Sequence, residues 1–495
     1  MQREMYELLA RRSKFCFSLI ELFQVEDDWL EVKKVSTNLE ISDRSVQRYI
    51  HYLEEIIEDY NQEKNAHIHM HYEKFKGIKM DFSDSSIEQL KLYIVSNDEN
   101  LKLLIDLCLL KTEPLKKYAD KNFISPYSIK NSVITINQLL ASFKLKVDTR
   151  SLTFTGEEKT SRFFTYIFLW AMYKNSPWPF EYVDEKKIYQ SIATIEAGFG
   201  YTYSNIQKKQ IAYFIAICLI RNKKKFYIDS TENWDTYVNI HALRKEELIV
   251  KGMNNYQIFE NNELTFLLVI MQMKHRMYRS SEIRDRILNY HKKNNTDILQ
   301  ATNLAFEKFQ EDFFRIPEEK LDVFYTYFFC THLQSKIFPG VYFDLDGYDS
   351  LEDTNVPKNL VRKLNAFVKE MKASTNSDIF DEEELLVKRY LLLFSFFENW
   401  VAYEPKITVA IDSDMSFLVR ERLKKMLQRR FEGKYNLEMV ESVGNSEDNC
   451  LVITNMPSIN GYHPENICVV EPPLRPKDFL VVERKIEETL EGLYD

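Results

Sequence analysis

The chain has 495 residues, 45% of them hydrophobic and 14% aromatic, so it can bury several cores in about three domains of ordinary size. Only 11 residues are glycine, about 2% against ~7% in average proteins, which disfavours glycine-rich phosphate loops and all-β sandwiches. A net charge of −9 excludes a protein coated in positive charge, but not a small basic region on an acidic body. These numbers predict a mainly helical, multidomain protein.

The six cysteines are widely separated and form no CxxC pair, which predicts reduced, buried thiols rather than disulfides or a thiolate zinc site. The first fifteen residues are charged and lack the apolar stretch of a signal peptide. The longest apolar run, residues 211–220, is well short of the ~18 residues that span a bilayer. We therefore expect a soluble, cytoplasmic protein with no membrane partner.

Residues 13–60 carry three apolar stripes with helical spacing, separated by short breaks at 24–28 and 40–43. Alternating residues at 67–71 and 78–82 flank Gly77 and predict a β-hairpin. The same plan then recurs. Helices are predicted at 101–110, 115–121 and 126–140, followed by strands at 144–147 and 152–155 that Gly156 closes. Gly77 and Gly156 are the only glycines before residue 190, and we expect both in tight hairpin turns with positive φ.

Residues 30–53 have the pattern of a helix-turn-helix, in which a second helix presents polar side chains to the major groove. Ser42 is a suitable N-cap for that helix, and Val46, Ile50 and Leu53 would face the core. The alternative is a structural helical hairpin with a solvated polar face. The candidate DNA-binding residues in and around the turn are Ser42, Arg44, Ser45, Gln47, Arg48 and His51.

The second copy follows the same logic, with Ser125 as the cap of the helix at 126–140. Residues 115–150 contain seven basic and two acidic side chains, whereas residues 42–80 contain six basic and seven acidic ones. Because phosphate contacts release counterions, this charge difference favours the second copy if only one of the two binds the DNA backbone strongly. Its candidate DNA-binding residues are Ser125, Tyr127, Ser128, Lys130 and Asn131.

His67, His69 and His71 alternate along a predicted strand and could share one face, a spacing that a metal site could use. No carboxylate or thiolate partner is obvious, so we favour a wing whose imidazoles face solvent or DNA. The sequence contains no GxxxxGK[ST], GxGxxG or HExxH motif and no defensible nucleophile–base pair. We therefore expect no enzyme activity, no cofactor and no metal.

From residue 162 to 400 the chain is a series of aromatic-rich helical segments, which predicts two helical bundles that divide near residue 290. Four histidines lie there, and each is more often structural than functional: His241, His275, His291 and His332. After residue 403, strands at 407–411, 437–441, 450–454 and 467–471 alternate with helices at 416–431 and 476–490. This alternation predicts a small α/β domain with a parallel sheet.

This order of parts resembles the Mga/AtxA-type transcriptional regulators of Gram-positive bacteria, which have domains regulated by the phosphotransferase system. The resemblance is carried by residues 30–53, by 115–140 with the continuation Thr153–Glu158 (TFTGEE) and Arg162-Phe163-Phe164, and by the tail from Ile407. It implies a mainly α, multidomain fold. The implied domains are two winged helix-turn-helix domains (1–84 and 85–172), two helical regulatory bundles (173–290 and 291–402) and a C-terminal α/β domain like enzyme IIB (403–495).

The resemblance also implies a function: a DNA-binding transcriptional regulator, and an activator of virulence or carbohydrate-linked genes. It implies a homodimer formed through the C-terminal domain, and control by a phosphocarrier protein that phosphorylates histidines of the bundles, first His275 and His332 and then His241. The tail departs from a working enzyme IIB, because the loop after its first strand, residues 412–416, contains two aspartates and no thiol. The alternative is a phosphotransferase-type signalling or protein-interaction module that does not bind DNA, which the acidic first copy favours.

Overall fold

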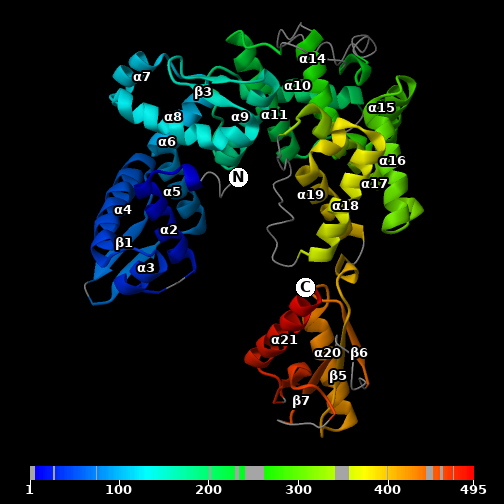
Figure 1. Ribbon diagram of the computed structural model, residues 1–495. Coiled ribbons are helices and arrows are strands. Elements are labelled where there is room, and N and C mark those ends of the chain that lie inside the picture. Colours follow the sequence, from blue (N-terminus) through cyan, green and yellow to red (C-terminus); the bar gives the residue numbers. More distant parts are fainter. Residues whose placement is uncertain are drawn as a thin grey trace. The chain divides into compact units, whose positions relative to one another are not determined.

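The computed structural model is mainly helical, with a small parallel sheet near the C-terminus, as the sequence predicts (Figure 1). It describes residues 6–25, 28–73, 75–199, 202–228, 234–239, 261–340, 356–397, 400–441, 450–456, 461–471 and 473–494. The chain divides into two compact units: Met1–Thr296 with Gly340–Tyr342, and Asp297–Pro339 with Phe343–Asp495.

The N-terminal part of the first unit has one apolar core, to which four helices and a hairpin contribute. Leu19 of the first of these helices and Val46, Ile50 and Leu53 of the third are all buried. The last helix also belongs here, because its residues Ile87, Leu90 and Ile94 pack in the same core. The elements are α2 (Arg11–Val25), α3 (Val32–Asn38), α4 (Asp43–Lys64), β1 (His69–Glu73), β2 (Gly77–Asp81) and α5 (Asp84–Asn97).

Leu30 adds a third strand position to the β1–β2 hairpin, since its backbone exchanges hydrogen bonds of 2.8 and 2.9 Å with Ile78. Gly77 has φ +101°, and a Cβ at this position would overlap the carbonyl oxygen of Leu30. The predicted positive φ is therefore confirmed. The glycine is required by the close approach of Leu30 as well as by its own backbone conformation.

The plan recurs in α6 (Glu99–Cys108), α7 (Leu115–Asn122), α8 (Pro126–Leu140), β3 (Lys146–Asp148), β4 (Thr153–Thr155) and then α9 (Glu158–Tyr173). Strands β3 and β4 pair antiparallel. Gly156 has the predicted positive φ, +128°, and lies directly after β4, so it closes the hairpin rather than forming its turn. Leu152, with φ +51°, is the left-handed residue of the turn. Gly156 is needed where the chain leaves the hairpin, because a Cβ there would meet Leu145.

The first unit continues with α10 (Glu185–Phe199), α11 (Asn205–Lys223), α14 (Asn261–Gln272) and α15 (Ser281–Lys293). A buried ionic network joins α9, α11 and α14. Arg162 donates to Glu158 at 2.9 Å and to both oxygens of Glu263 at 2.5 and 2.9 Å, and Arg221 donates to Glu158 at 2.6 Å. Because two arginines face two glutamates, the buried charges of the network balance.

In the second unit, α16 (Asp297–Asp312), α17 (Leu321–Ile337), α18 (Lys358–Thr375) and α19 (Glu383–Phe397) enclose an aromatic core. Phe309 is fully buried, and its ring lies 4.8 to 5.4 Å from the rings of Phe313, Phe328 and Phe394. These contacts confirm aromatic-rich helices that are buried on several sides.

The tail of the second unit is a four-stranded parallel sheet in the order β6-β5-β7-β8, as its buried apolar strands predict. Both of its helices contribute to one core on the sheet, with Leu423 and Leu427 from the first and Val482 and Ile486 from the second. The elements are β5 (Ile407–Ile411), α20 (Phe417–Phe431), β6 (Leu437–Val440), β7 (Cys450–Thr454), β8 (Ile467–Val469) and α21 (Pro476–Tyr494). All six cysteines are buried and unbridged, as predicted.

Candidate nucleic-acid interface

The turn between α3 and α4 is built as the sequence predicts. Glu40 has φ +52°, and the chain then extends through Ser42, whose hydroxyl accepts the Ser45 backbone N–H at 3.3 Å. This cap satisfies a donor that the first helical turn would otherwise leave open. Val46, Ile50 and Leu53 are buried, so the opposite side of α4 is fixed outward.

On that outward side, Arg44, Gln47, Arg48 and His51 are exposed and Ser45 is half-buried. The guanidinium of Arg48 lies 4.9 Å from the centre of the Tyr49 ring. This cation–π contact orients the guanidinium and leaves its N–H groups available as hydrogen-bond donors. His51 Nδ1 lies 2.9 Å from a Glu54 oxygen. The arrangement can present arginine and amide donors to base edges, which remains a prediction for these residues.

The turn between α7 and α8 has the same construction. Phe123, with φ +55°, ends α7, and Ser125 then caps α8 by accepting the Ser128 backbone N–H at 3.0 Å. Pro126 occupies the first position of α8, where its missing N–H costs nothing. The Ser128 hydroxyl donates to Glu99 of α6 at 3.2 Å, so this predicted site residue is partly engaged within its own domain.

The outer face of α8 combines polar and apolar side chains. Lys130 and Asn131 are exposed, Tyr127 is 74% exposed and Ile134 is 60% exposed. Phe123, just before the cap, is 96% exposed. Sequence reasoning missed Phe123 and Ile134. An aromatic residue in the left-handed position of a helix C-terminus, where glycine is usual, was the available signal.

The basic side chains around α8 are largely unneutralised. Lys116, Lys130 and Lys146 are exposed, and the described part of the chain offers them no ion-pair partner. Lys117 and Lys121 both pair with Glu113. The surface that carries α8 therefore keeps the local positive charge that phosphate binding requires.

Residues 83–169 match the family described as the Mga helix-turn-helix domain. This segment is a Mga-type domain. The match includes α7, α8 and the β3–β4 hairpin, and so confirms the resemblance seen in the sequence.

Two curated proteins of Bacillus anthracis are homologous to the chain beyond the Mga domain. The capsule synthesis positive regulator AcpB is 22% identical over 316 residues, which cover 62% of this chain and 61% of AcpB. The anthrax toxin expression trans-acting positive regulator is 24% identical over 244 residues, which cover 46% of this chain and 48% of that regulator. Each alignment thus covers less than two thirds of the relative's length. Both relatives are named as regulators, not as enzymes.

His67, His69 and His71 in and next to β1 are exposed around the buried Ile68, as an alternating strand predicts. His71 Nε2 lies 3.1 Å from an Asp81 oxygen across the hairpin, a carboxylate neighbour that sequence reasoning did not find. Within the described ranges, no three histidine, cysteine or acidic side chains come together as a metal site would need.

The buried histidines of the two bundles are hydrogen-bonded on both ring nitrogens. In the first unit, His291 is fully buried, and its Nε2 lies 3.1 Å from Gln272 Oε1 and its Nδ1 2.9 Å from the Thr296 hydroxyl. In the second unit, His332 is fully buried beside Thr302, at 2.8 Å, and Tyr390, at 2.6 Å.

The tautomer of His332 follows from its neighbours. The Thr302 hydroxyl donates to the Ile298 carbonyl at 2.7 Å, so it accepts from Nδ1–H, and Nε2 accepts from the Tyr390 hydroxyl. Burial lowers the pKa of His332 from 6.5 to about 3 and raises the pKa of Tyr390. A phosphoryl group on His332 would displace one of these hydrogen bonds.

His275, the other first candidate, is half-buried at the start of a short helical turn, His275–Arg279. It is therefore more accessible than His332. His241 lies outside the described residues. Phosphorylation of any of the three stays a prediction.

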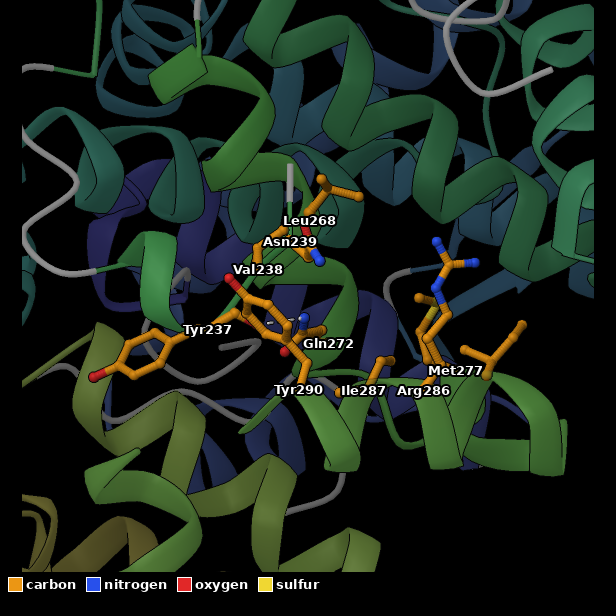
Figure 2. A pocket seen from close by; sticks show the side chains of 10 residues that line it. Tyr237, Val238, Asn239, Leu268, Gln272, Met277, Arg286, Ile287 and Tyr290 are labelled. Atoms are coloured by element: carbon orange, nitrogen blue, oxygen red, sulfur yellow. Dashed lines mark hydrogen bonds between the residues drawn. The ribbon is translucent and has the colours of Figure 1, made fainter. Parts of the chain in front are cut away.

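A small pocket lies beside Gln272, the hydrogen-bond partner of His291, and its lining is mainly aliphatic and aromatic with three polar side chains, Asn239, Gln272 and Arg286. Figure 2 shows Tyr237 and Tyr290 on one side of the view and Met277 and Arg286 on the other. Gln272 donates to the Tyr237 carbonyl at 3.1 Å. This lining offers hydrophobic contact and one cationic side chain, and it brings no nucleophile and base together.

The loop after β5 contains two aspartates, Asp412 and Asp414. Tyr462 donates to Asp412 at 3.2 Å, and Asn455 donates to Asp414 at 2.6 Å. The two aspartates are thus held in place by neutral donors.

Among the described helices, none is both long and apolar enough to cross a membrane.

Proposed function

We propose that this chain is a DNA-binding transcriptional regulator whose Mga domain places α8 in the major groove. The observation that carries the proposal is the exposed face of α8, which follows a turn capped by Ser125 and is flanked by unpaired lysines. In this proposal Tyr127 and Asn131 contact base edges and Lys130 contacts phosphate. The β3–β4 hairpin, with exposed Lys146 and Arg150, lies along the backbone as a wing.

In the same proposal, the two winged helix-turn-helix heads are the domains predicted at 1–84 and 85–172, with α5 (Asp84–Asn97) packed in the core of the first head. The first reads DNA with Arg44, Gln47 and Arg48, but it carries less positive charge and contributes less affinity. Contacts between the heads support their acting together. The backbone N–H of Ala10 donates to Asp98 at 2.8 Å, and the Asn100 side chain donates to the Leu8 carbonyl at 2.8 Å.

The test is fluorescence anisotropy at low salt with the protein's own upstream region and with an unrelated duplex of equal length. Lys130→Ala should weaken binding to both duplexes, whereas Asn131→Ala and Arg48→Ala should lower the preference between them. Lys102→Ala is the matched control, because Lys102 is also an exposed lysine of the Mga domain but lies on α6. Binding that is absent, or that responds equally to all four changes, contradicts the proposal.

The proposed regulator is a homodimer, assembled through its tail, and an activator of virulence or carbohydrate-linked genes. The names of both relatives, positive regulators of capsule synthesis and of toxin expression, support activation. Exposed apolar residues on the tail helices, Phe417 at 64%, Leu418 at 76% and Leu480 at 57%, support a protein interface there.

Activity would be tuned by a phosphocarrier protein acting on the bundles. The half-buried position of His275 makes it the first acceptor, ahead of His332, and His241 remains a candidate. Mass spectrometry after incubation with the phosphotransferase components should find an acid-labile phosphate on His275 that His275→Ala removes. If no histidine of the bundles is modified, the phosphorylation proposal fails and only the proposal of DNA binding stands.

The acidic first head favours a second candidate, a phosphotransferase-type signalling or protein-interaction module without DNA binding. The region 42–80 carries one more acid than base, which opposes phosphate binding. The same anisotropy titration separates the two functions, since the module would bind neither duplex at low salt.

A further inference from the structure

Helix α20 concentrates positive charge in a chain that is acidic as a whole. Its fifteen residues contain one acid, Glu421, and six cations, so the helix carries 6 − 1 = +5 in a chain of −9. The cations are Arg420, Arg422, Lys424, Lys425, Arg429 and Arg430. The other tail helix, α21, has five acids against three cations, so the positive charge belongs to α20 and not to the tail at large.

The outer side of α20 presents four of these cations to solvent, Arg422, Lys425, Arg429 and Arg430, whereas Arg420 and Lys424 are half-buried. Leu423, Leu427 and Phe431 are buried in the tail core, which fixes the opposite side outward. Arg422, Lys425 and Arg429 are exposed and follow at spacings of three and four residues, so they form one stripe. At ~1.5 Å of rise per residue the stripe is about 10 Å long.

None of the six cations has a hydrogen bond, ion pair or ring contact with any residue that the structure describes. Several other cations of the tail are paired, as Lys434 is with Glu483 and Arg475 with Asp478. Arg429 and Arg430 lie in the last turn, where the helix dipole favours them. Arg422, Lys424 and Lys425 have no such compensation, and like charges one turn apart destabilise a helix by a few tenths of a kcal/mol.

We propose that the α20 face, defined by Arg422, Lys425 and Arg429, binds the phosphate backbone of double-stranded DNA without sequence preference. The proposal rests on the proposed function, which supplies the duplex. The length of the stripe matches about three successive phosphates of one strand, which are ~3.4 Å apart along the duplex axis.

The burial of the apolar side of α20, rather than charge, favours DNA over an anionic membrane, since both partners are negatively charged. A helix that lies in a membrane interface buries an apolar side in the lipid, but the apolar side of α20 is already buried in the tail core. The most exposed apolar residues of α20, Phe417, Leu418 and Val419, lie in its first turn before the basic stripe begins, and within the stripe only Met426 is exposed, at 36%.

The test uses the full-length protein and measures the affinity for two labelled duplexes, the upstream region and a random sequence, over a range of salt. The variant Arg422→Gln/Lys425→Gln/Arg429→Gln keeps good helix formers on exposed positions. The control Lys186→Gln/Lys187→Gln/Lys292→Gln removes the same charge from exposed positions on α10 and α15.

We expect the α20 variant to bind both duplexes ten-fold or more weakly at low salt, with the slope of log K against log salt reduced by up to about 3. The control should change both quantities less. An α20 variant whose salt slope equals that of the control overturns the proposal. The proposal is also overturned if the α20 variant changes only the sedimentation velocity, or only the binding to vesicles of anionic phospholipid.

The outcome separates this proposal from the proposed function. If Asn131→Ala abolishes the preference for the upstream region while the α20 variant changes nothing, the reading heads stand and the α20 proposal fails. If the α20 variant weakens binding while changes on α8 have no effect, DNA binding by α20 stands and the assignment of α8 fails.

Discussion

At the residue scale, Phe123 combines a strained backbone conformation with an exposed aromatic side chain. Its φ of +55° lies in the left-handed region, which costs a residue with a Cβ about 1 kcal/mol, and its aromatic side chain is 96% exposed. DNA binding would explain why an aromatic residue stands here. Phe123 follows α7 just before the cap of α8, where its ring can contact a thymine methyl group or a sugar.

We therefore predict that Phe123→Gly raises the free energy of unfolding by about 0.5–1 kcal/mol and weakens binding to the upstream duplex. Glu40→Gly is the matched control, since Glu40 has φ +52° at the equivalent turn before α4 and is also exposed. It should stabilise the fold similarly with less effect on affinity. Urea unfolding and anisotropy measure the two effects, and unchanged DNA affinity in Phe123→Gly would rule out the contact.

The pKa of His332 makes the second unit sensitive to acid. Folding lowers this pKa from 6.5 to about 3, so below pH 6.5 the unfolded chain binds a proton that the folded chain does not. The titration of this histidine therefore leaves the free energy of unfolding unchanged above pH 6.5. As the pH falls from 6.5 toward 3, this free energy decreases by up to ~1.4 kcal/mol per pH unit. Between pH 7.5 and 5 the loss from His332 alone is about 2 kcal/mol.

We predict that His332→Gln is less stable than the parent at pH 7.5, because a buried partner, Thr302 or Tyr390, loses its hydrogen bond. Between pH 7.5 and 5 the variant should lose about 2 kcal/mol less stability than the parent. His463→Gln, an exposed histidine of the same unit, should leave the pH dependence unchanged. Urea titrations at the two pH values decide, and equal acid sensitivity in His332→Gln and the parent would refute the assignment.

At the element scale, α9 joins the β3–β4 hairpin to the helices α11 and α14. The helix begins at Glu158, two residues after Gly156, and its Glu158 and Arg162 enter the buried network with Arg221 and Glu263. Removing one partner of a buried ion pair leaves an uncompensated charge in a low-dielectric environment. The network therefore makes the position of α9 dependent on α11 and α14.

We predict that Glu263→Gln lowers the free energy of unfolding of the first unit by about 3 kcal/mol or more. Glu181→Gln is the control, because the exposed Glu181 pairs with Lys111 at the surface, where such a pair is worth at most about 1 kcal/mol. Urea unfolding measures both. Similar losses in the two variants would mean that the network is not a stabilising junction.

The sequence predicts the elements well where the signals are local. The bounds of α8, β5 and β7 agree with those expected, because Ser125, Pro126 and the apolar periodicity act within a few residues. The buried network and the neighbours of His332 were not predictable. Their partners are separated by up to 101 residues, as for Arg162 and Glu263, and only the packed fold brings them together.

At the scale of the whole molecule, an acidic chain keeps positive charge on two surfaces, the α8 region and α20, and exposes apolar residues next to the second. A two-fold dimer through the tail would double each basic surface and so multiply weak phosphate contacts on one duplex. Leu418, 76% exposed in the first turn of α20, is the best single residue with which to test this interface.

We predict that Leu418→Glu converts the dimer to a monomer, because a charge buried in an interface is strongly unfavourable. Leu304→Glu is the matched control, since Leu304 is a 50% exposed leucine of α16 in the same unit but outside the tail. Sedimentation velocity and cross-linking should show a dimer for the parent and for Leu304→Glu. Deletion of the residues after Tyr403 should reproduce the monomer, and a truncated chain that still dimerises would place the interface in the bundles or the heads.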